Sequence, residues 1–226
     1  MAATLDIISN GRVILGIGAG WNESEHKAYG ISWNPSPWSR IEQMMEGVEI
    51  IKRMWTEEKP SYEGRYYKIK DAVCNPKPVQ KPHPPIFIGG VGEKFMLRIV
   101  AKYANGWNTP PLPVEVYARK AEVLRKHCLD VGVRFDSIEK TIEQRVIIRR
   151  NREEITKILC KKNVFTPKVD VQSLKKAFLI GTPDECIKRI GEYVDIGVTR
   201  FMLWFLDFSS MDGIRIFAKE VMPSFN

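Results

Sequence analysis

The feature that most constrains the fold is a short, unbroken apolar run that ends in glycines and occurs twice, at residues 12–18 and 85–90. A strand without polar alternation is buried on both faces, as in parallel sheets and barrels. A helical pattern follows the first run, because apolar side chains recur every three or four positions over 38–55 behind Ser36 and Pro37. This order predicts an α/β chain with parallel strands joined by right-handed crossovers.

The same alternation continues to the end of the chain. Further strands are expected at 106–108, 141–149 and 199–205, and further helices at 93–103, 114–131, 153–162, 182–196 and 211–221. The helix after residue 181 is the most clearly marked, since Thr182 and Glu185 form a capping box around Pro183. Residues 62–67 are typical of a turn with flanking β structure. The segment 163–176 gives no prediction, and an insertion is expected around 150–176.

Composition sets the class of protein. The length of 226 residues suits one domain covering 1–226, and the hydrophobic fraction of 44% is that of a globular chain. The longest apolar runs fall far short of the ~20 residues of a membrane span. No secretory signal is visible at the N-terminus, so we expect a soluble, cytoplasmic protein without a membrane partner.

The basic excess is 35 − 27 = +8, and its distribution does not favour nucleic acid. The densest basic cluster, 145–152, is followed by Glu153 and Glu154 and belongs to no nucleic-acid-binding motif. We therefore expect a solvated charged surface, or a field that attracts a small anion, and no nucleic-acid partner. No metal site is expected either, because no ligand spacing joins the dispersed cysteines and histidines, Cys74, Cys128, Cys160, Cys186, His26, His83 and His127.

Two glycine-rich strand-to-helix junctions, 16–20 and 89–92, are the candidate ligand sites. Glycine allows positive φ and close approach of a ligand to the backbone, and a helix N-terminus attracts an anion. Lys94 and Arg98 add positive charge after the second junction, which is the better phosphate candidate against a purely structural turn. The first junction fails the dinucleotide fingerprint, because Trp21 stands where its third glycine would be.

Several segments together resemble a known family. They are 5–12, 15–21, Glu25 with 29–30, 62–67, 76–80, 84–90, 104–108 and 180–185. In this order and spacing the chain resembles the bacterial-luciferase-like superfamily, and specifically its deazaflavin-dependent oxidoreductase branch. The resemblance covers nearly the whole chain and is weakest over 130–175.

The resemblance implies a (β/α)8 TIM barrel that binds coenzyme F-420, or FMN in other branches, at the carboxyl ends of its strands. Three strand–helix units precede the position of Leu5 in the family, so the chain corresponds to an N-terminally shortened barrel of about five units. The catalytic residues stay unknown, because those units supply the polar groups of the family's active site. The implied cofactor-binding residues are Ala19, Gly20, Trp21, Gly89, Gly90, Val91, Gly92, Trp107 and Asn108.

The expected function is hydride transfer between F-420 and a small organic substrate. The alternatives are a non-catalytic flavin- or deazaflavin-binding protein, a fragment completed by another chain, and an FMN-dependent monooxygenase. We also expect a homo-oligomer, dimer or higher, that covers exposed barrel edges. Replacement of Gly90 by valine is expected to abolish cofactor binding and leave the fold intact.

Overall fold

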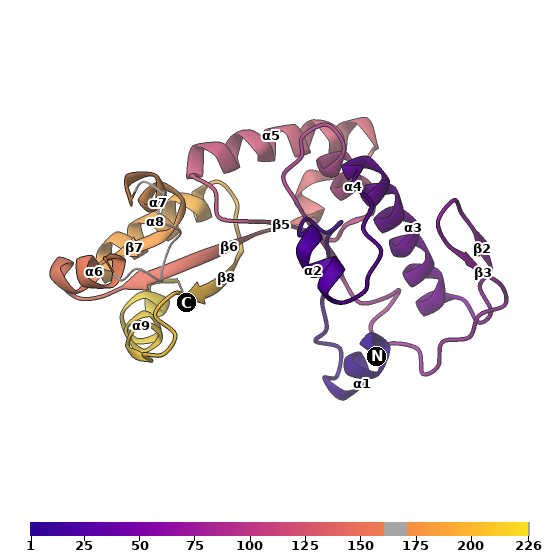
Figure 1. Cartoon of the computed structure of the whole chain (residues 1–226), viewed down its shortest axis with the longest axis horizontal. Coiled ribbons are helices and arrows are strands. Elements are labelled where there is room, and N and C mark those ends of the chain that lie inside the picture. Colours follow the sequence, from indigo (N-terminus) through magenta and orange to yellow (C-terminus); the bar gives the residue numbers. More distant parts are fainter. Residues whose placement is uncertain (161–170, 226) are drawn as a thin grey trace. The chain divides into compact units, whose positions relative to one another are not determined.

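The computed structural model describes residues 1–160 and 171–225, and the chain forms two compact units. The first unit comprises Met1–Trp107 and His127–Ile138, and the second comprises Asn108–Lys126 and Glu139–Asn226. The boundaries fall inside two elements, β5 (Gly106–Thr109) and α5 (Val114–Asp130). Figure 1 labels the elements along the sequence. That 1–226 is one domain stays a prediction.

The sheet of the first unit confirms the predicted parallel strands. β1 (Leu15–Ile17) lies beside β4 (Ile86–Gly89), and β4 lies beside β5. The first two are parallel, with Leu15 opposite Ile86 and Ile17 opposite Ile88. β1 is shorter than the predicted strand at 12–18, and α4 (Met96–Tyr103) begins three residues after the predicted start at 93, because a turn occupies 93–95.

α3 (Pro37–Thr56) begins where its capping residues predict. The Ser36 hydroxyl accepts the N–H of Ser39 at 3.3 Å, and Pro37 occupies the first turn. The turn with flanking β structure predicted at 62–67 is present: residues 64–67 connect the antiparallel strands β2 (Tyr62–Glu63) and β3 (Lys68–Ile69). Two helices precede α3: α1 (Ala2–Ile8), which was not predicted, and α2 (Glu23–Ala28).

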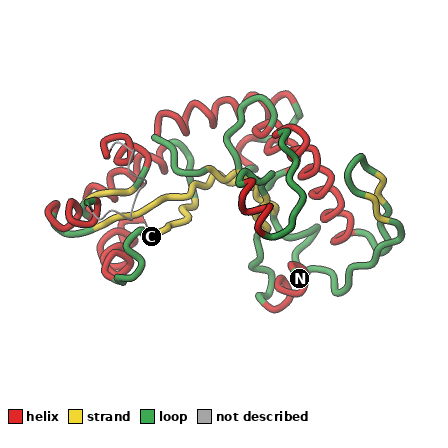
Figure 2. The backbone as a smooth tube through the Cα atoms, in the orientation of Figure 1, coloured by secondary structure: helices red, strands yellow, loops and turns green. Residues whose placement is uncertain are grey.

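The second unit is organised around β6 (Glu139–Ile148), the longest strand in Figure 2. β7 (Leu179–Gly181) and β8 (Arg200–Phe205) both run parallel to β6, with Val146 opposite Leu179 and opposite Phe205. The helices are α6 (Arg152–Leu159), α7 (Val171–Ala177), α8 (Pro183–Asp195) and α9 (Asp212–Ile216). Short 3-10 helices lie at Phe135–Ser137, in the first unit, and at Met222–Phe225.

The core of the second unit joins β6 to its helices. Val146 and Ile148 pack with Cys186 and Ile190 of α8 and with Phe217. The predicted capping box is present, since the Thr182 side chain accepts the backbone N–H of Glu185 and the Glu185 carboxylate accepts the N–H of Thr182. Gly197, just after α8, takes the left-handed conformation that ends many helices, with φ +90°.

Two predictions need comment. The final helix, expected as one element over 211–221, is α-helical only to Ile216 and continues as a π-helix over Phe217–Val221. The expected insertion around 150–176 includes α6 and part of α7, while residues 161–170 lie outside the described residues. No described helix is long and apolar enough to cross a membrane. Within 1–160 and 171–225, no group of three or more acidic, histidine or cysteine side chains could hold a metal ion.

Candidate functional site

The two glycine-rich junctions meet at one edge of the sheet in the first unit. Because β1 and β4 are parallel and Ile17 lies opposite Ile88, Gly18–Gly20 and Gly89–Gly92 follow neighbouring strands at their carboxyl ends. In β/α barrels the binding and catalytic groups lie at this end of the strands. The register therefore brings together two groups of implied cofactor-binding residues, 19–21 after β1 and 89–92 at the end of β4.

The turn after β4 has a shape that only glycine allows. Gly90 has φ +144°, and a Cβ placed on it would lie 2.7 Å from Cγ of Met96. The indole Nε1 of Trp107 donates a hydrogen bond to the Gly90 carbonyl at 2.8 Å. Since Trp107 is completely buried, this bond fixes the turn from the neighbouring strand β5. Trp107 thus acts on the backbone of the turn rather than presenting its ring at the surface.

The helix that follows this turn offers an N-terminus to an anion. Its N-cap residue, Phe95, makes no side-chain hydrogen bond to the first turn of α4. Lys94 and Arg98 are exposed near it, and Nζ of Lys94 lies 5.1 Å from the centroid of the Phe95 ring. A Cβ on Gly92 would come no closer than 3.5 Å to Met96, so the backbone there is open to a ligand.

The turn after β1 is also shaped by its glycine. Gly20 has φ +74°, and a Cβ on it would lie 2.9 Å from Cε1 of His26. The guanidinium Nε of Arg40 donates to the Gly20 carbonyl at 3.3 Å. Trp21, which follows, is 85% exposed and so is available to a ligand. This implied cofactor-binding side chain therefore lies on the surface.

A cavity of about 510 Å³ adjoins this turn. It lies between the carboxyl end of β1 and α3, and its lining includes Ile17, Ala19, His26, Arg40 and Met44. The lining mixes apolar side chains with one cation and one imidazole, which suits an organic molecule with a polar end. Nδ1 of His26 lies 2.8 Å from the Asn22 carbonyl, so the ring is held in place.

Asn108, the last predicted contact residue, belongs to the second unit. Its Oδ1 accepts a hydrogen bond from the Thr141 hydroxyl of β6 at 2.8 Å. The amide is thereby oriented by a side chain of the same unit. Its place at the cofactor stays a prediction, as do the contacts of the other eight residues.

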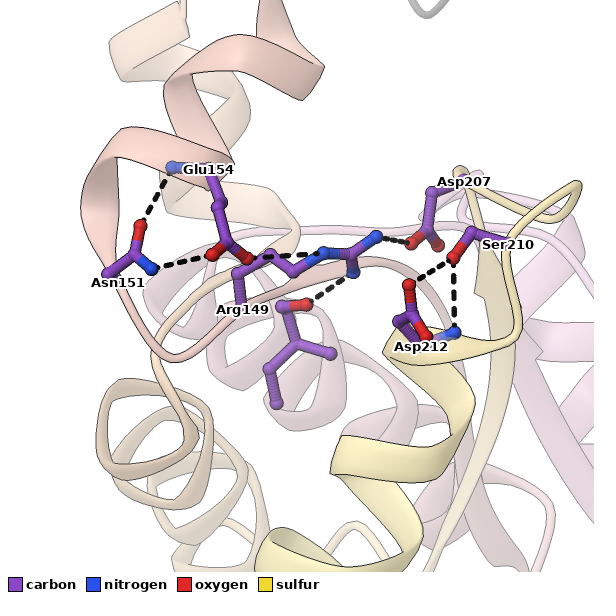
Figure 3. A network of polar contacts seen from close by, with 7 residues as sticks. Arg149, Asn151, Glu154, Asp207, Ser210 and Asp212 are labelled. Atoms are coloured by element: carbon purple, nitrogen blue, oxygen red, sulfur yellow. Dashed lines mark hydrogen bonds and ion pairs between the residues drawn. The ribbon is translucent and has the colours of Figure 1, made fainter.

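One polar group was not expected from the sequence. Figure 3 shows Arg149, directly after β6, against Asp207, two residues after β8; Nη2 and Oδ2 are 2.6 Å apart. Both side chains are buried, with exposed fractions of 10% and 7%. The available signal was position alone, because Arg149 is the last residue of the strand predicted at 141–149 and Asp207 follows the strand predicted at 199–205, and barrel chemistry is found at such strand ends.

The chain was compared with known protein families and curated proteins. Residues 1–166 match the model of the luciferase-like monooxygenase family. An uncharacterized protein of Mycobacterium bovis is 37% identical over half of the chain, and the matched part is 39% of that relative's length. An F-420-dependent glucose-6-phosphate dehydrogenase of Microbacterium testaceum is 28% identical over 98% of the chain and 71% of its own length. An FMNH(2)-dependent dimethylsulfone monooxygenase of Pseudomonas putida is 26% identical over 98% of the chain and 68% of its own length.

Solved structures show the same fold. An F-420-dependent secondary alcohol dehydrogenase, in complex with an F-420–acetone adduct, superposes with a TM-score of 0.83 at 22% identity. The match covers all of this chain and 73% of that chain. The predicted fold class, a luciferase-like α/β barrel type with parallel strands, is therefore confirmed.

Proposed function

Because the chain belongs to the luciferase-like monooxygenase family, we propose that it is an oxidoreductase component that binds coenzyme F-420 and serves hydride transfer to or from a small organic substrate. The family assignment covers the oxidoreductase class, and F-420-dependent enzymes are among the relatives. When bound, the deazaflavin supplies the hydride chemistry, and the protein supplies binding and orientation.

The observation that carries the proposal is the turn after β4. Gly90 has no room for a side chain, Trp107 fixes its carbonyl, and the first turn of α4 receives no side-chain cap. Such a turn holds an anionic group by backbone N–H groups and the helix dipole. In this proposal Gly89–Gly92 hold the cofactor phosphate, and Ala19, Gly20 and Trp21 lie along the ring system.

FMN is the second candidate, because one relative is an FMNH(2)-dependent monooxygenase. Both cofactors carry a phosphate and a flat tricyclic ring, so the same turn serves either. The choice between them is made by titration of the purified chain with each cofactor, followed through quenching of cofactor fluorescence.

The test of the site uses two glycine variants. Gly92→Ala adds a methyl group to the open backbone without a clash, since its nearest neighbour would be 3.5 Å away. We expect the dissociation constant of F-420 to rise by about tenfold, equivalent to ~1.4 kcal/mol. Gly191→Ala is the matched control: it lies in α8 of the second unit, where an added Cβ meets nothing within 4 Å.

Each outcome separates the alternatives. Binding of F-420 with turnover of a secondary alcohol supports the oxidoreductase, and binding without turnover supports a cofactor-binding protein or a fragment completed by another chain. Binding of neither F-420 nor FMN overturns the proposal. An unchanged dissociation constant in Gly92→Ala shows that the phosphate lies elsewhere.

We further propose that the chain self-associates. Among the described strands, β1 pairs only with β4 and β8 pairs only with β6, so each leaves one strand edge unpaired. Exposed parallel edges favour association with another chain. On β8 the exposed side chains include Met202 and Trp204. Light scattering after gel filtration gives the oligomeric state, and a monomer at all concentrations contradicts this proposal.

A further inference from the structure

The segment that follows β4 is held at a second point, three residues beyond the carbonyl that Trp107 holds. Nε2 of His127, in the last turn of α5, lies 2.8 Å from the carbonyl oxygen of Glu93. A carbonyl oxygen only accepts, so Nε2 carries the hydrogen and donates it, whether the imidazole is neutral or protonated. The two residues are 34 positions apart in the sequence, and both belong to the first unit.

The position of this imidazole is set by α5 rather than by the segment that it contacts. The side chain of His127 is only 19% exposed. Leu124 is completely buried one turn earlier, and Cys128, the next residue, is 1% exposed. The Cys128 carbonyl accepts the N–H of Val133 at 2.9 Å, which closes the end of the helix. On the other side of the ring, Nδ1 lies 3.9 Å from Oδ2 of Asp130. His127 is therefore a fixed donor.

The bond to Glu93 also fixes the direction of the next N–H group. In a planar trans peptide the carbonyl and the following N–H point in opposite directions. Because the Glu93 carbonyl points at His127, the N–H of Lys94 points away from α5. Residues 92–95 are exposed, and the N–H of Leu97 closes this stretch by donating to the Gly92 carbonyl at 3.0 Å. The Lys94 N–H is thus held toward the surface.

The charge near this N–H group is positive and is not compensated. Lys94 and Arg98 are both exposed, and neither forms an ion pair with any residue in 1–160 or 171–225. By contrast, the four arginines of the cluster 145–152 each have a carboxylate within 4 Å. An anion that accepts the Lys94 N–H would therefore meet two cations without displacing a carboxylate.

We propose that His127 is a positioning residue for the cofactor phosphate: it holds the Glu93 carbonyl and so directs the Lys94 N–H to donate to a phosphate oxygen. The inference rests on the proposed function. It adds a fifth backbone position to the turn Gly89–Gly92, and it gives a role to a side chain of α5 that does not touch the cofactor itself.

Three variants of His127 separate the donor from the bulk of the ring. His127→Leu removes the donor and keeps an apolar side chain, and His127→Phe does the same with a ring, for use if the leucine variant does not fold. His127→Gln keeps an N–H donor at a similar reach. The matched control is His83→Leu. His83 is a histidine of the same unit whose Nδ1 lies 2.8 Å from the Pro84 carbonyl, before β4 rather than after it.

The main measurement compares FMN with riboflavin, which differ only in the phosphate group, by quenching of flavin fluorescence. We expect His127→Leu to raise the dissociation constants of FMN and F-420 by about tenfold, equivalent to ~1.4 kcal/mol, and to leave that of riboflavin unchanged. His127→Gln should restore most of the lost affinity, and His83→Leu should bind as the native chain does. A purely structural role would weaken FMN and riboflavin alike, in proportion to the folded fraction.

A second measurement does not depend on a flavin or deazaflavin. Inorganic phosphate is titrated into the native chain and followed by the NMR chemical shift of the Lys94 amide. The native chain should show a saturable shift, and His127→Leu should need about tenfold more phosphate to reach the same shift. Failure of the proposed function is distinguished in this way, because the chain would then bind neither F-420 nor FMN while the phosphate titration still tests His127.

Three results overturn the inference. They are a Lys94 amide that phosphate does not shift, equal weakening of FMN and riboflavin in His127→Leu, and a loss of FMN affinity that His127→Gln does not restore. Unchanged FMN affinity in both donor-free variants has the same consequence. If Gly92→Ala weakens F-420 while His127→Leu does not, the phosphate lies at the glycines and the Lys94 N–H takes no part.

Discussion

Two turns at the carboxyl ends of strands, one in each unit, are fixed in different ways. The turn after β4 is fixed by the Trp107 indole, which donates to the Gly90 carbonyl at 2.8 Å. The turn after β8 is fixed by Arg149, which holds the Asp207 carboxylate at 2.6 Å. In each case a side chain from outside the turn, on or directly after another strand, fixes it.

The difference lies in what each turn offers to a ligand. The first is built from glycines and offers bare backbone, which suits the oxygens of a phosphate. The second exposes the apolar side chains of Phe208 and Met211. A neutral hydrogen bond is sufficient to orient a carbonyl, whereas the second turn uses full charges that must both be buried. Removing the fixing contact should therefore lower the free energy of unfolding by different amounts at the two turns.

The largest effect is expected from removing one charge of the buried pair. Asp207→Ala leaves the Arg149 guanidinium with only the distant Glu154 carboxylate, at 3.8 Å. Loss of one partner of a buried pair typically costs about 3–5 kcal/mol. Urea denaturation measures the change in the free energy of unfolding. Hydrogen exchange of the β8 amides identifies which unfolding transition belongs to the second unit.

The control for this variant is an exposed ion pair of the same unit. Arg152 and Glu185 are 2.6 Å apart, but their side chains are 82% and 43% exposed. Arg152→Ala should therefore change stability by less than about 1 kcal/mol. Equal effects of Asp207→Ala and Arg152→Ala would show that the buried pair does not fix the turn.

A smaller effect is expected from crowding the glycine turn. Gly90→Ala places a Cβ 2.7 Å from Met96 at φ +144°, so it strains both packing and backbone, by about 1–3 kcal/mol. The same crowding bears on the expectation that Gly90→Val leaves the fold intact, which stays a prediction for the thermal unfolding measurement to test. Gly16→Ala, where an added Cβ meets nothing within 4 Å, is the control for the thermal unfolding measurement.

A third variant removes the indole hydrogen bond together with part of the buried ring. Trp107→Phe keeps an aromatic ring in the buried site but leaves the Gly90 carbonyl without its donor, at a cost of about 1–3 kcal/mol including the lost ring volume. We expect weaker F-420 binding as well, because the turn is no longer fixed. Trp204→Phe changes an exposed tryptophan and should alter neither quantity. Unchanged cofactor affinity in Trp107→Phe would show that the indole hydrogen bond does not contribute to phosphate binding at this turn.

Local signals explain which of these features the sequence could predict. The apolar runs before the glycines, Ser36 with Pro37, and the Thr182–Glu185 capping box each lie within a few residues, and the structure contains all of them. Each glycine turn was accordingly predicted to follow a strand. That the two turns lie at one edge of the sheet comes from the register of β1 with β4 in the structure.

The contacts that fix the turns could not be predicted in the same way. Trp107 lies 17 positions from Gly90, and Arg149 lies 58 positions from Asp207. Trp107 was identified from the resemblance as a cofactor contact, which stays a prediction, whereas its hydrogen bond to the Gly90 carbonyl was not expected from the sequence. An arginine after one strand and an aspartate after another are common in any basic chain. Only the three-dimensional pairing of β6 with β8 shows that these two meet.

The smallest expected effect is a dependence on pH. A turn held by a carboxylate should lose hydrogen-exchange protection in acid, whereas the turn held by the indole should not. After β7, the Glu185 carboxylate accepts the N–H of Thr182 at 2.8 Å and Arg152 lies beside it. The Thr182 backbone N–H is the main cause that lowers the pKa of Glu185 below 4.5, against an opposing effect of burial, and Arg152 lowers it further. A lowered folded-state pKa contributes stability that is present above the unfolded-state value and is lost as pH falls through the folded-state value. Hydrogen exchange of the Thr182 amide should therefore lose protection as pH falls below 4.5, the usual value, and on through the lowered folded-state pKa, after correction for intrinsic exchange. The Trp107 indole N–H should keep its protection, because no titrating group takes part in its bond to the Gly90 carbonyl. Glu185→Gln removes the pH dependence at Thr182, and equal loss at both sites would instead indicate global acid unfolding.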